Sequence, residues 1–305
     1  MEHPLGKKTR RRKANTTCLP ALKDPLLFID TNILLDFYRA RNEQNLALLD
    51  RIDAVHDRTI SSYQVEMEFK KNRQKVIIET LNLLKISDQV TAPAYLASHK
   101  SLVAARNGLK RAQGMIDLVK QSLQLALHNP TSHDPVYKVA QRLFSNNSQW
   151  NLTRDNTDRF RLRRLAGKRF VLGYPPRKNN DTSIGDAINW EWIVACAAED
   201  KRDIVIVSRD ADYGVTFGNE SYINDWLLRE FKQRVSKKGR VVLTGKLSEA
   251  LKYLDQPVTA QEEAGEAELI AEDAAKFAAS GWRLNDPELL RLVASGQLCT
   301  PEDAS

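Results

Sequence analysis

Short apolar runs are the feature of this sequence that most restricts its fold, because each has the length of a strand buried on both faces. They lie at residues 25–29, 204–207 and 241–243, and longer stretches with helical spacing of apolar residues separate them. Strands without alternating polar residues are typical of parallel sheets covered by helices. Strands that alternate with helices therefore predict an α/β fold with a central parallel sheet.

The helical pattern divides the chain into three parts. Helices are predicted at residues 34–39, 46–52, from 62 onward, 76–127, 154–166, 184–199 and 247–254, with a short strand at 59–61. The stretch at about 70–173 is too long for one crossover, so we treat it as a helical insertion in a domain spanning 25–256. A basic, flexible tail is expected at 1–24. An acidic, loosely attached appendage, helical or disordered, is expected at 257–305.

Composition restricts the class of protein. Of the 305 residues, 42% are hydrophobic, which is enough for a substantial core. No apolar run approaches the roughly 18 residues of a membrane span, and no signal-peptide core follows the N-terminal charges. Cys18, Cys196 and Cys299 lie far apart, so they predict neither a disulfide framework nor a zinc site. We expect a cytoplasmic protein with no membrane partner.

The net charge of +7 favours a polyanionic partner such as a nucleic acid. Basic residues are concentrated at 7–13 and at 154–169. The first group is typical of a solvated tail. In the second group, Arg161 and Arg164 stand at helical spacing, and they predict part of a phosphate-binding stripe.

Four acids are placed where distant parts of the chain would meet. Asp30 follows the first strand directly, and Asp210 comes three positions after the strand at 204–207. The carboxyl ends of parallel strands lie at one edge of a sheet, where sites form. Asp186 lies in the first turn of the helix at 184–199, and Glu68 lies in the helix that starts near Ser62. We therefore expect these four acids at one rim of the sheet.

A cluster of four acids predicts a bound cation, because repelling carboxylates are costly to gather without one. Magnesium prefers oxygen ligands, often one or two carboxylates with waters and a substrate phosphate. An ion of this kind can activate a water and neutralise charge on a scissile phosphate. The pattern thus predicts phosphodiester hydrolysis without a Ser, Cys or His nucleophile, for which the sequence offers no convincing triad.

Each acid also has a simpler structural interpretation. Asp30 could cap the helix that follows it, and Asp186 sits where any acid favours the helix dipole. Glu66 and Glu68 lie roughly 200° apart around a helix, so only one of them can face the site. The joint placement of the acids carries the hypothesis, and no single acid does.

Four motifs together resemble the PIN domain family. They are FIDTNILL at 28–35, QVEMEF at 64–69 followed by NR at 72–73, GDAINW at 185–190 and VIVSRD at 205–210. Their order and spacing are similar to those of bacterial PIN-like proteins with large helical insertions, over most of residues 25–256. The resemblance implies a Rossmann-like sheet and a magnesium- or manganese-dependent ribonuclease.

The resemblance also implies roles for the acids. Carried over residue by residue, it makes Asp30, Glu68, Asp186 and Asp210 the catalytic metal ligands. Asp212 would join them as the further acid that this family often has, although an Asp-Ala-Asp turn is also ordinary loop chemistry. Asp181 lies in the loop where related chains carry an acid.

Two substrate-binding residues are implied near these acids. Asn32 would orient Asp30 or contact a phosphate. The sequence departs from the family pattern at Ser208 and Arg209, where many relatives carry threonine and an uncharged or acidic residue. Arg209 would bind a phosphate or pair with Asp210.

Two other functions compete with a nuclease. Phosphatases of the haloacid-dehalogenase kind also begin with a strand ending in Asp, but they usually need a second Asp two positions later, where this chain has Asn32. A catalytically silent nucleic-acid-binding module is the second rival, and the presence of all four expected acids argues against it. Trp190 and Trp192 could stack on bases. Core packing is the more typical role for Trp190, and Trp192 is undecided.

The sequence leaves the biology open. It does not distinguish RNA from DNA as the substrate, nor one metal ion from two. A toxin, a defence effector and a housekeeping nuclease would all fit, and a protein partner or a homo-oligomer is possible.

Overall fold

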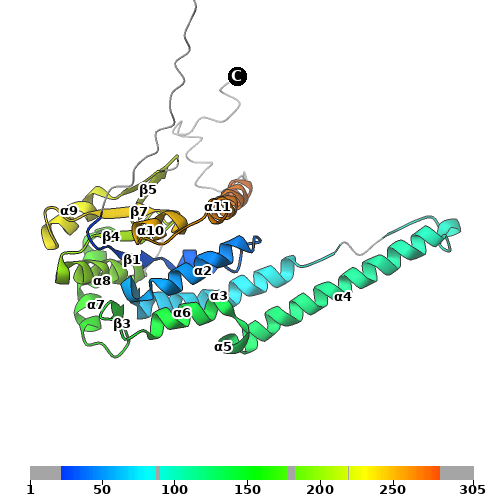
Figure 1. Cartoon of the computed structure of the whole chain (residues 1–305), viewed down its shortest axis with the longest axis horizontal. Helices are drawn as coiled ribbons and strands as arrows, with labels where there is room; N and C mark the ends of the chain where they lie inside the picture. Colours follow the sequence, from blue (N-terminus) through cyan, green and yellow to red (C-terminus); the bar gives the residue numbers. More distant parts are fainter. Residues whose placement is uncertain (1–21, 87–89, 178–182, 219, 282–305) are drawn as a thin grey trace, which may run out of the picture.

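The central sheet has five strands in the order β3-β2-β1-β4-β7, each paired in parallel with its neighbours (Figure 1). They are β1 (Leu26–Ile29), β2 (Thr59–Ser62), β3 (Asn151–Leu152), β4 (Ile204–Val207) and β7 (Val241–Thr244). This computed structural model describes residues 22–86, 90–177, 183–218 and 220–281. Every residue of β1 and β4 is buried, as expected for central strands of a covered sheet. The predicted α/β fold with a parallel sheet is confirmed.

Helices lie on both sides of this sheet (Figure 1). Their bounds are α1 (Thr31–Asp36), α2 (Gln44–Ala54), α3 (Tyr63–Leu83), α4 (Lys100–His128), α5 (Pro130–His133), α6 (Pro135–Ser145), α7 (Asp158–Leu172), α8 (Gly185–Asp200), α9 (Asp225–Arg234), α10 (Leu247–Tyr253) and α11 (Ala260–Gly281), with short 3-10 turns at His56–Arg58 and Ala94–Leu96. One side carries α8, with α7 and α9 against it, and the other carries α2, α6 and α10.

Local chemistry explains where α3 begins and where α7 ends. Ser62 caps α3, because the backbone N–H of Val65 donates to its hydroxyl at 3.2 Å. At the end of α7, Gly173 adopts a φ of 72°, the left-handed conformation that favours glycine at a helix C-terminus. The Ser62 cap was expected from the sequence, whereas the helix predicted at 154–166 continues to Leu172.

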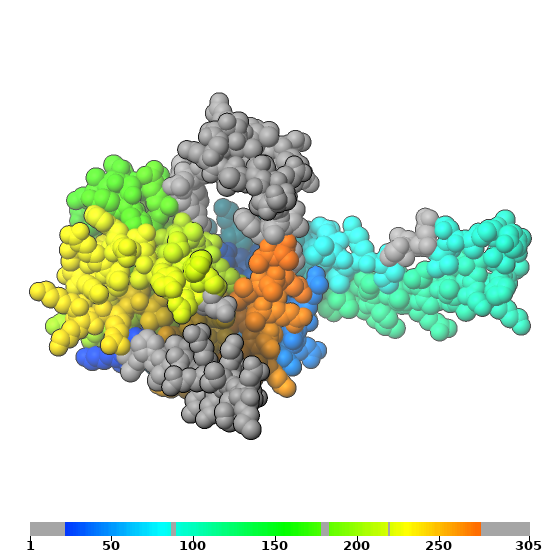
Figure 2. Space-filling model, turned by 90° about the horizontal axis from the view of Figure 1, so that it is seen from above, coloured from blue at the N-terminus to red at the C-terminus, as the bar shows by residue number. Residues whose placement is uncertain are grey.

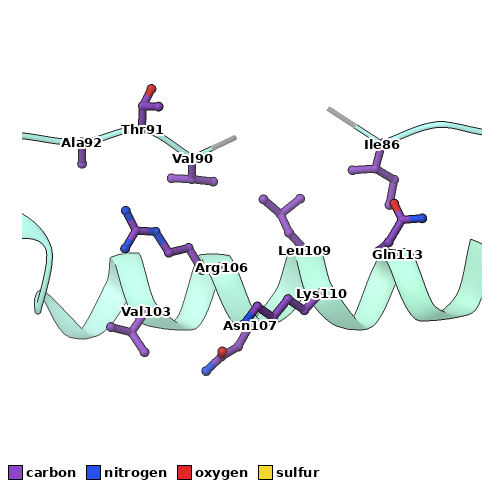
Figure 3. A pocket seen from close by; sticks show the side chains of 10 residues that line it. All are labelled: Ile86, Val90, Thr91, Ala92, Val103, Arg106, Asn107, Leu109, Lys110 and Gln113. Atoms are coloured by element: carbon purple, nitrogen blue, oxygen red, sulfur yellow. The ribbon is translucent and has the colours of Figure 1, made fainter. Parts of the chain in front are cut away.

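A long arm projects from the body of the protein (Figures 1 and 2). It consists of the second half of α3, the segment that leads outward from α3, and α4, which returns to the body, and it lies within the stretch predicted as a helical insertion. The exposed large apolar residues of α4 are aliphatic, namely Val103, Met115, Leu118, Val119 and Leu125. An open cleft of about 800 Å³ lies between α4 and the segment that leads outward from α3, lined by residues that include Val90, Arg106 and Leu109 (Figure 3).

The strand β3 is a difference from the sequence prediction, which placed no strand between residues 62 and 204. It has only two residues, and one of them is the polar Asn151. The Asn151 side chain donates to the carbonyls of Phe144 and Asn146, both at 2.8 Å, so it is satisfied although buried. Because a run this short has no readable periodicity, the sequence could not reveal this edge of the sheet.

The C-terminal segment is attached more closely than its composition predicted. Helix α11 contacts α2 and α10, and it buries the acids Glu262 and Glu266 together with Leu269. Glu266 accepts the N–H groups of Leu247 and Ser248 at 2.6 and 2.9 Å, which caps α10. The acids that suggested a solvated appendage are therefore packing groups. Residues 1–21 of the expected basic tail, and 282–305, lie outside the described residues.

Both tryptophans of α8 belong to the core. Trp190 is fully buried and donates through Nε1 to Glu230 at 3.2 Å. Trp192 is 6% exposed, and its Nε1 donates to the carbonyl of Ser61 at 2.9 Å. The core role expected for Trp190 is confirmed, and neither ring is available to stack on a base.

Candidate active site

Asp30 lies where the sheet places the ends of two neighbouring strands. In the β1–β4 pair, Ile29 is opposite Val207, so Asp30 and Ser208 follow side by side at the carboxyl edge. The Ser208 hydroxyl donates to Asp30 Oδ2 at 2.6 Å. The same hydroxyl accepts the backbone N–H of Asp210 at 3.1 Å. One serine therefore links the two acids that follow β1 and β4.

Glu68 is brought to the same rim by α3. Its carboxylate accepts from Thr31 Oγ1 at 3.3 Å and from Gln64 Nε2 at 2.7 Å, and Thr31 directly follows Asp30. Glu66, two residues away, is turned toward Lys70 and pairs with it at 2.6 Å. The structure thus separates the two glutamates as the helical period required.

The first turn of α8 reaches Glu68 because it begins with a glycine. A Cβ atom on Gly185 would lie 2.6 Å from Glu68 Oε1, closer than real Cβ contacts. Any side chain here would therefore displace the Glu68 carboxylate and the Gln64 amide that donates to it. Further along, Ser62 donates to Asn189 at 2.7 Å and ties α8 to the end of β2. Together these contacts hold Asp186, the residue after Gly185, at the rim.

Tyr213 marks the point where the acids converge. Its ring packs on Phe28, with ring centroids 6.1 Å apart, and its side chain is buried. Burial raises the pKa of Tyr213 well above its usual value, and the charges of Asp186, Asp30, Glu68 and Asp212 raise it further. Within the described residues its hydroxyl has no hydrogen-bond partner. The tyrosine therefore leaves an unsatisfied polar atom facing this group of carboxylates.

Among these crowded acids, Asp30 has a raised pKa. It is 6% exposed. Burial raises its pKa to about 6, the Ser208 hydroxyl opposes this, and the charges of Asp210 and Glu68 add to the rise. A carboxylate with a raised pKa among like charges has much to gain from a nearby cation. Such perturbed groups are concentrated at functional sites.

The donors suit a hard divalent cation in their chemistry, since all are carboxylate or hydroxyl oxygens. The unsatisfied Tyr213 hydroxyl also points to a polar centre rather than a packed core. However, no three His, Cys, Asp or Glu side chains in the described part of the chain form a set close enough to hold an ion. The residues therefore fit a metal by donor type, and the carboxylates are near one another without forming a closed ligand shell.

The remaining candidate residues have different surroundings. Asn32 is partly buried on α1, one residue beyond Thr31. The Arg209 guanidinium pairs with Asp36 and donates to the Gly245 carbonyl at 3.1 Å.

The two arginines of the predicted stripe lie on α7 and are exposed; Arg161 pairs with Asp158 at 3.2 Å, and Arg164 points into solvent. Asp181 lies outside the described residues.

Several residues that shape the site were not singled out from the sequence. Thr31 and Gln64 act by holding Glu68, and Tyr213 by lying under the acids. Ser208 was noticed only as a departure from a family pattern, whereas the structure gives it two hydrogen bonds in the site. Its place directly after a buried strand was a usable signal, and Tyr213 offered none beyond its closeness to Asp212.

Comparison with known proteins agrees with this arrangement. A family profile described as a PIN domain matches residues 27–213. No curated protein and no solved structure gives a match. Among the described helices, none combines the length and apolar character needed to cross a membrane.

Proposed function

Since the chain belongs to the PIN domain family, we propose that it is a metal-dependent nuclease, and specifically an endoribonuclease that hydrolyses phosphodiester bonds. The observation that carries this proposal is the buried Asp30, whose pKa is raised to about 6 by burial and by neighbouring Asp210 and Glu68. A buried, ionised Asp30 destabilises the fold, and a cation bound with a phosphate would offset that free-energy cost.

We propose that Asp30, Glu68, Asp186 and Asp210, joined by Asp212, hold Mg²⁺ or Mn²⁺. When bound, the ion would supply charge neutralisation at the scissile phosphate and a more acidic water. The chain's own contribution is orientation. Ser208 fixes one oxygen of Asp30, while Thr31 and Gln64 fix both oxygens of Glu68. Residues that orient metal ligands in this way typically change affinity or activity about 10–100-fold when they are removed.

Substrate binding is proposed for four side chains around this rim. Asn32 lies in α1, two residues after Asp30, where it would orient Asp30 or contact a phosphate. Arg209 is held beside the rim by its ion pair with Asp36, and it would offer its remaining N–H groups to a phosphate there. Arg161 and Arg164 would bind the phosphate backbone from α7. RNA is favoured over DNA only by the resemblance of the motifs.

A catalytically silent nucleic-acid-binding module is the second candidate. The observation in its favour is that the described acids do not form a closed metal-binding set. Such a module would keep RNA affinity and show no cleavage. A phosphatase of the haloacid-dehalogenase kind would instead hydrolyse small phosphate esters.

The deciding experiment measures cleavage of labelled RNA and DNA with Mn²⁺. We expect Asp30→Asn and Glu68→Gln to lose more than about 100-fold in rate, the upper range for residues that only orient metal ligands. Affinity for RNA measured in EDTA should be unchanged or higher, since each variant removes a negative charge.

The matched control is Glu66→Gln, the same change on the same helix at a residue that pairs with Lys70. It should cleave like the wild type. Wild-type protein that cuts no nucleic acid with Mn²⁺, or an Asp30→Asn variant that cuts equally well, would end the nuclease proposal. Binding without cleavage would then support the silent module, and hydrolysis of small esters the phosphatase.

A further inference from the structure

A two-stranded hairpin leaves the acidic rim and turns an apolar face outward. It comprises β5 (Gly214–Phe217) and β6 (Glu220–Ile223), and it lies beside β7, at the opposite side of the sheet from β3 (Figure 1). The register pairs Val215 with Tyr222 and Phe217 with Glu220. Paired residues of antiparallel strands share a face. We call Val215, Phe217, Glu220 and Tyr222 the outer face of the hairpin.

The outer face is exposed, and the base of the opposite face packs against the sheet, while Thr216 further along that face is also exposed. Phe217 is 82% exposed, Val215 63% and Tyr222 50%. On the opposite face, a Cβ atom on Gly214 would lie 2.7 Å from a side-chain carbon of Leu243 in β7. The exposed rings therefore belong to an element whose base is fixed in place.

The base of the hairpin is anchored at the acids. Asp210 and Asp212 precede it, and the N–H of Asn224 donates back to the Tyr213 carbonyl at 2.9 Å. A strand of four residues rises about 13 Å, so Phe217 stands within that reach of Tyr213. The base of the hairpin thus adjoins the proposed catalytic rim.

A second exposed aromatic pair includes Trp226, which follows Asn224 by two residues and therefore lies near the base of the hairpin. Trp226, in the first turn of α9, is 43% exposed, and Tyr174 is 38% exposed. Their ring centroids are 4.9 Å apart at an interplanar angle of 42°. A groove of about 580 Å³ along α9 is lined by residues that include Arg229, Lys232 and Lys237. Helix α9 therefore carries an exposed aromatic ring in its first turn and basic side chains further along.

The kind of apolar residue favours a base as the occupant over a protein helix. The exposed face of α4 is aliphatic, which suits packing against another apolar side chain. The hairpin and α9 instead expose Phe217, Tyr222 and Trp226. Exposed flat rings suit single-stranded nucleic acids, because every base can stack on an aromatic ring.

We infer that the outer face of the β5–β6 hairpin is a stacking surface for unpaired bases, which positions a single-stranded nucleic acid across the acidic rim. Phe217 is the principal contact and Tyr222 the second. The inference rests on the proposed function only in taking a nucleic acid as the occupant. Bases inside a duplex have no free ring faces, so the surface selects single strands.

The test measures binding in EDTA, where metal-dependent cleavage does not interfere. The probes are an oligonucleotide of about 12 unpaired RNA residues carrying 2-aminopurine, whose fluorescence is quenched by stacking, and its blunt duplex. We expect Phe217→Ala to raise the Kd for the single strand about tenfold and to abolish the quenching. Phe217→Trp should bind and quench like the wild type, whereas Phe217→Leu should resemble the alanine variant. Thr216→Ala, on the opposite face, is the control and should change neither quantity.

Several results would overturn the inference. They are an unchanged Kd in Phe217→Ala, full binding by Phe217→Leu, equal affinity for the duplex, or wild-type protein that does not bind the strand. A dimer that dissociates in Phe217→Ala, seen by sedimentation, would assign the face to a second copy. If the wild type cleaves RNA but Phe217→Ala binds normally, the stacking inference fails alone. If binding depends on an aromatic residue at 217 but Mn²⁺ produces no cleavage, the nuclease proposal fails and the stacking surface stands.

Discussion

Glu191 of α8 and Glu230 of α9 form ion pairs with arginines, whereas Asp30 and Glu68 at the rim accept hydrogen bonds from neutral donors. Glu191 accepts from Arg169 at 2.9 Å and from Arg234 at 2.8 Å, and both Arg169 and Glu191 are almost fully buried. The hydrogen bonds to Asp30 and Glu68 come instead from hydroxyl and amide groups. The protein therefore has the means to neutralise buried acids and does not use arginine for these two.

The pKa values reflect this difference. Burial raises the pKa of Glu230, which lies in the arginine cluster, but Arg169 and Arg234 more than offset it, and the net shift is downward. Burial raises the pKa of Asp30 to about 6, and its acidic neighbours add to the rise. A paired acid stabilises the fold as an anion, and a crowded acid destabilises it as an anion. The opposite directions of the two pKa shifts distinguish a structural ion cluster from a site that a bound cation would stabilise.

The largest expected effect breaks the arginine cluster. Arg169→Met should lower the free energy of unfolding by about 3–5 kcal/mol, because it leaves Glu191 buried with part of its charge unmatched. Urea denaturation measures this directly. Arg161→Met is the matched control on the same helix, where the side chain is half exposed, and it should cost less than about 1 kcal/mol. Equal losses in the two variants would show that the buried cluster is not special.

A smaller effect should appear in the pH dependence of the rim. The pKa of Asp30 is about 6 in the folded protein against 3.8 for the unperturbed group. The folded state therefore binds the proton more tightly than the unfolded state does. The stability that results is fully present below pH 3.8 and is lost as the pH rises through about 6. The loss is on the order of 3 kcal/mol. In EDTA, the stability of Asp30→Asn relative to wild type should rise by most of this amount, about 2.4 kcal/mol, between about pH 4 and about pH 7.

Urea titrations at the two pH values test this, and the comparison with Glu230 sharpens it. Because the pKa of Glu230 is lowered, its contribution has the opposite sign: present above its unfolded value and lost as the pH falls. Replacing Glu230 by Gln should therefore cost more at neutral than at acid pH. If Asp30→Asn and Glu230→Gln show the same sign of pH dependence, the two regions do not differ as described.

Much of the site could be predicted because strand ends in a parallel sheet are a strong constraint. The acid after β1 and the acid near the end of β4 had to be neighbours once both runs were read as parallel strands. The Ser62 cap fixed the start of α3 and hence the side of the helix that carries Glu68. These deductions need only local sequence and one topological rule.

The parts that could not be predicted depend on long-range partners. Arg169 belongs to the same basic run as Arg161 and Arg164, yet it is buried because Glu191 and Glu230 meet it from other helices. Glu266 read as a solvated acid and instead caps α10. Charge in a sequence does not reveal whether its partner is water, a ligand or another side chain, and only the fold decides.

The smallest expected effect concerns the arginines of α7 that turn outward. Arg161 and Arg164 are exposed. By the helical period of about 100° per residue, they lie about 80° and about 140° around α7 from the buried Arg169. If they bind phosphates, reversing both to Glu should reduce the slope of log Kd against log salt for a single strand by at least about 1.4, since each phosphate contact contributes about 0.7. Fluorescence anisotropy over a salt series in EDTA measures the slope.

The control for this change is the double reversal of Arg106 and Lys110, which lie on the arm beside its cleft (Figure 3) and alter the net charge equally. It should leave the slope nearly unchanged, because a contact with phosphate releases counterions and distant charge does so only weakly. Equal slopes in the two double variants would mean that α7 acts through net charge alone. A lower slope only in the α7 variant would show that one helix places arginine inward for stability and outward for the substrate.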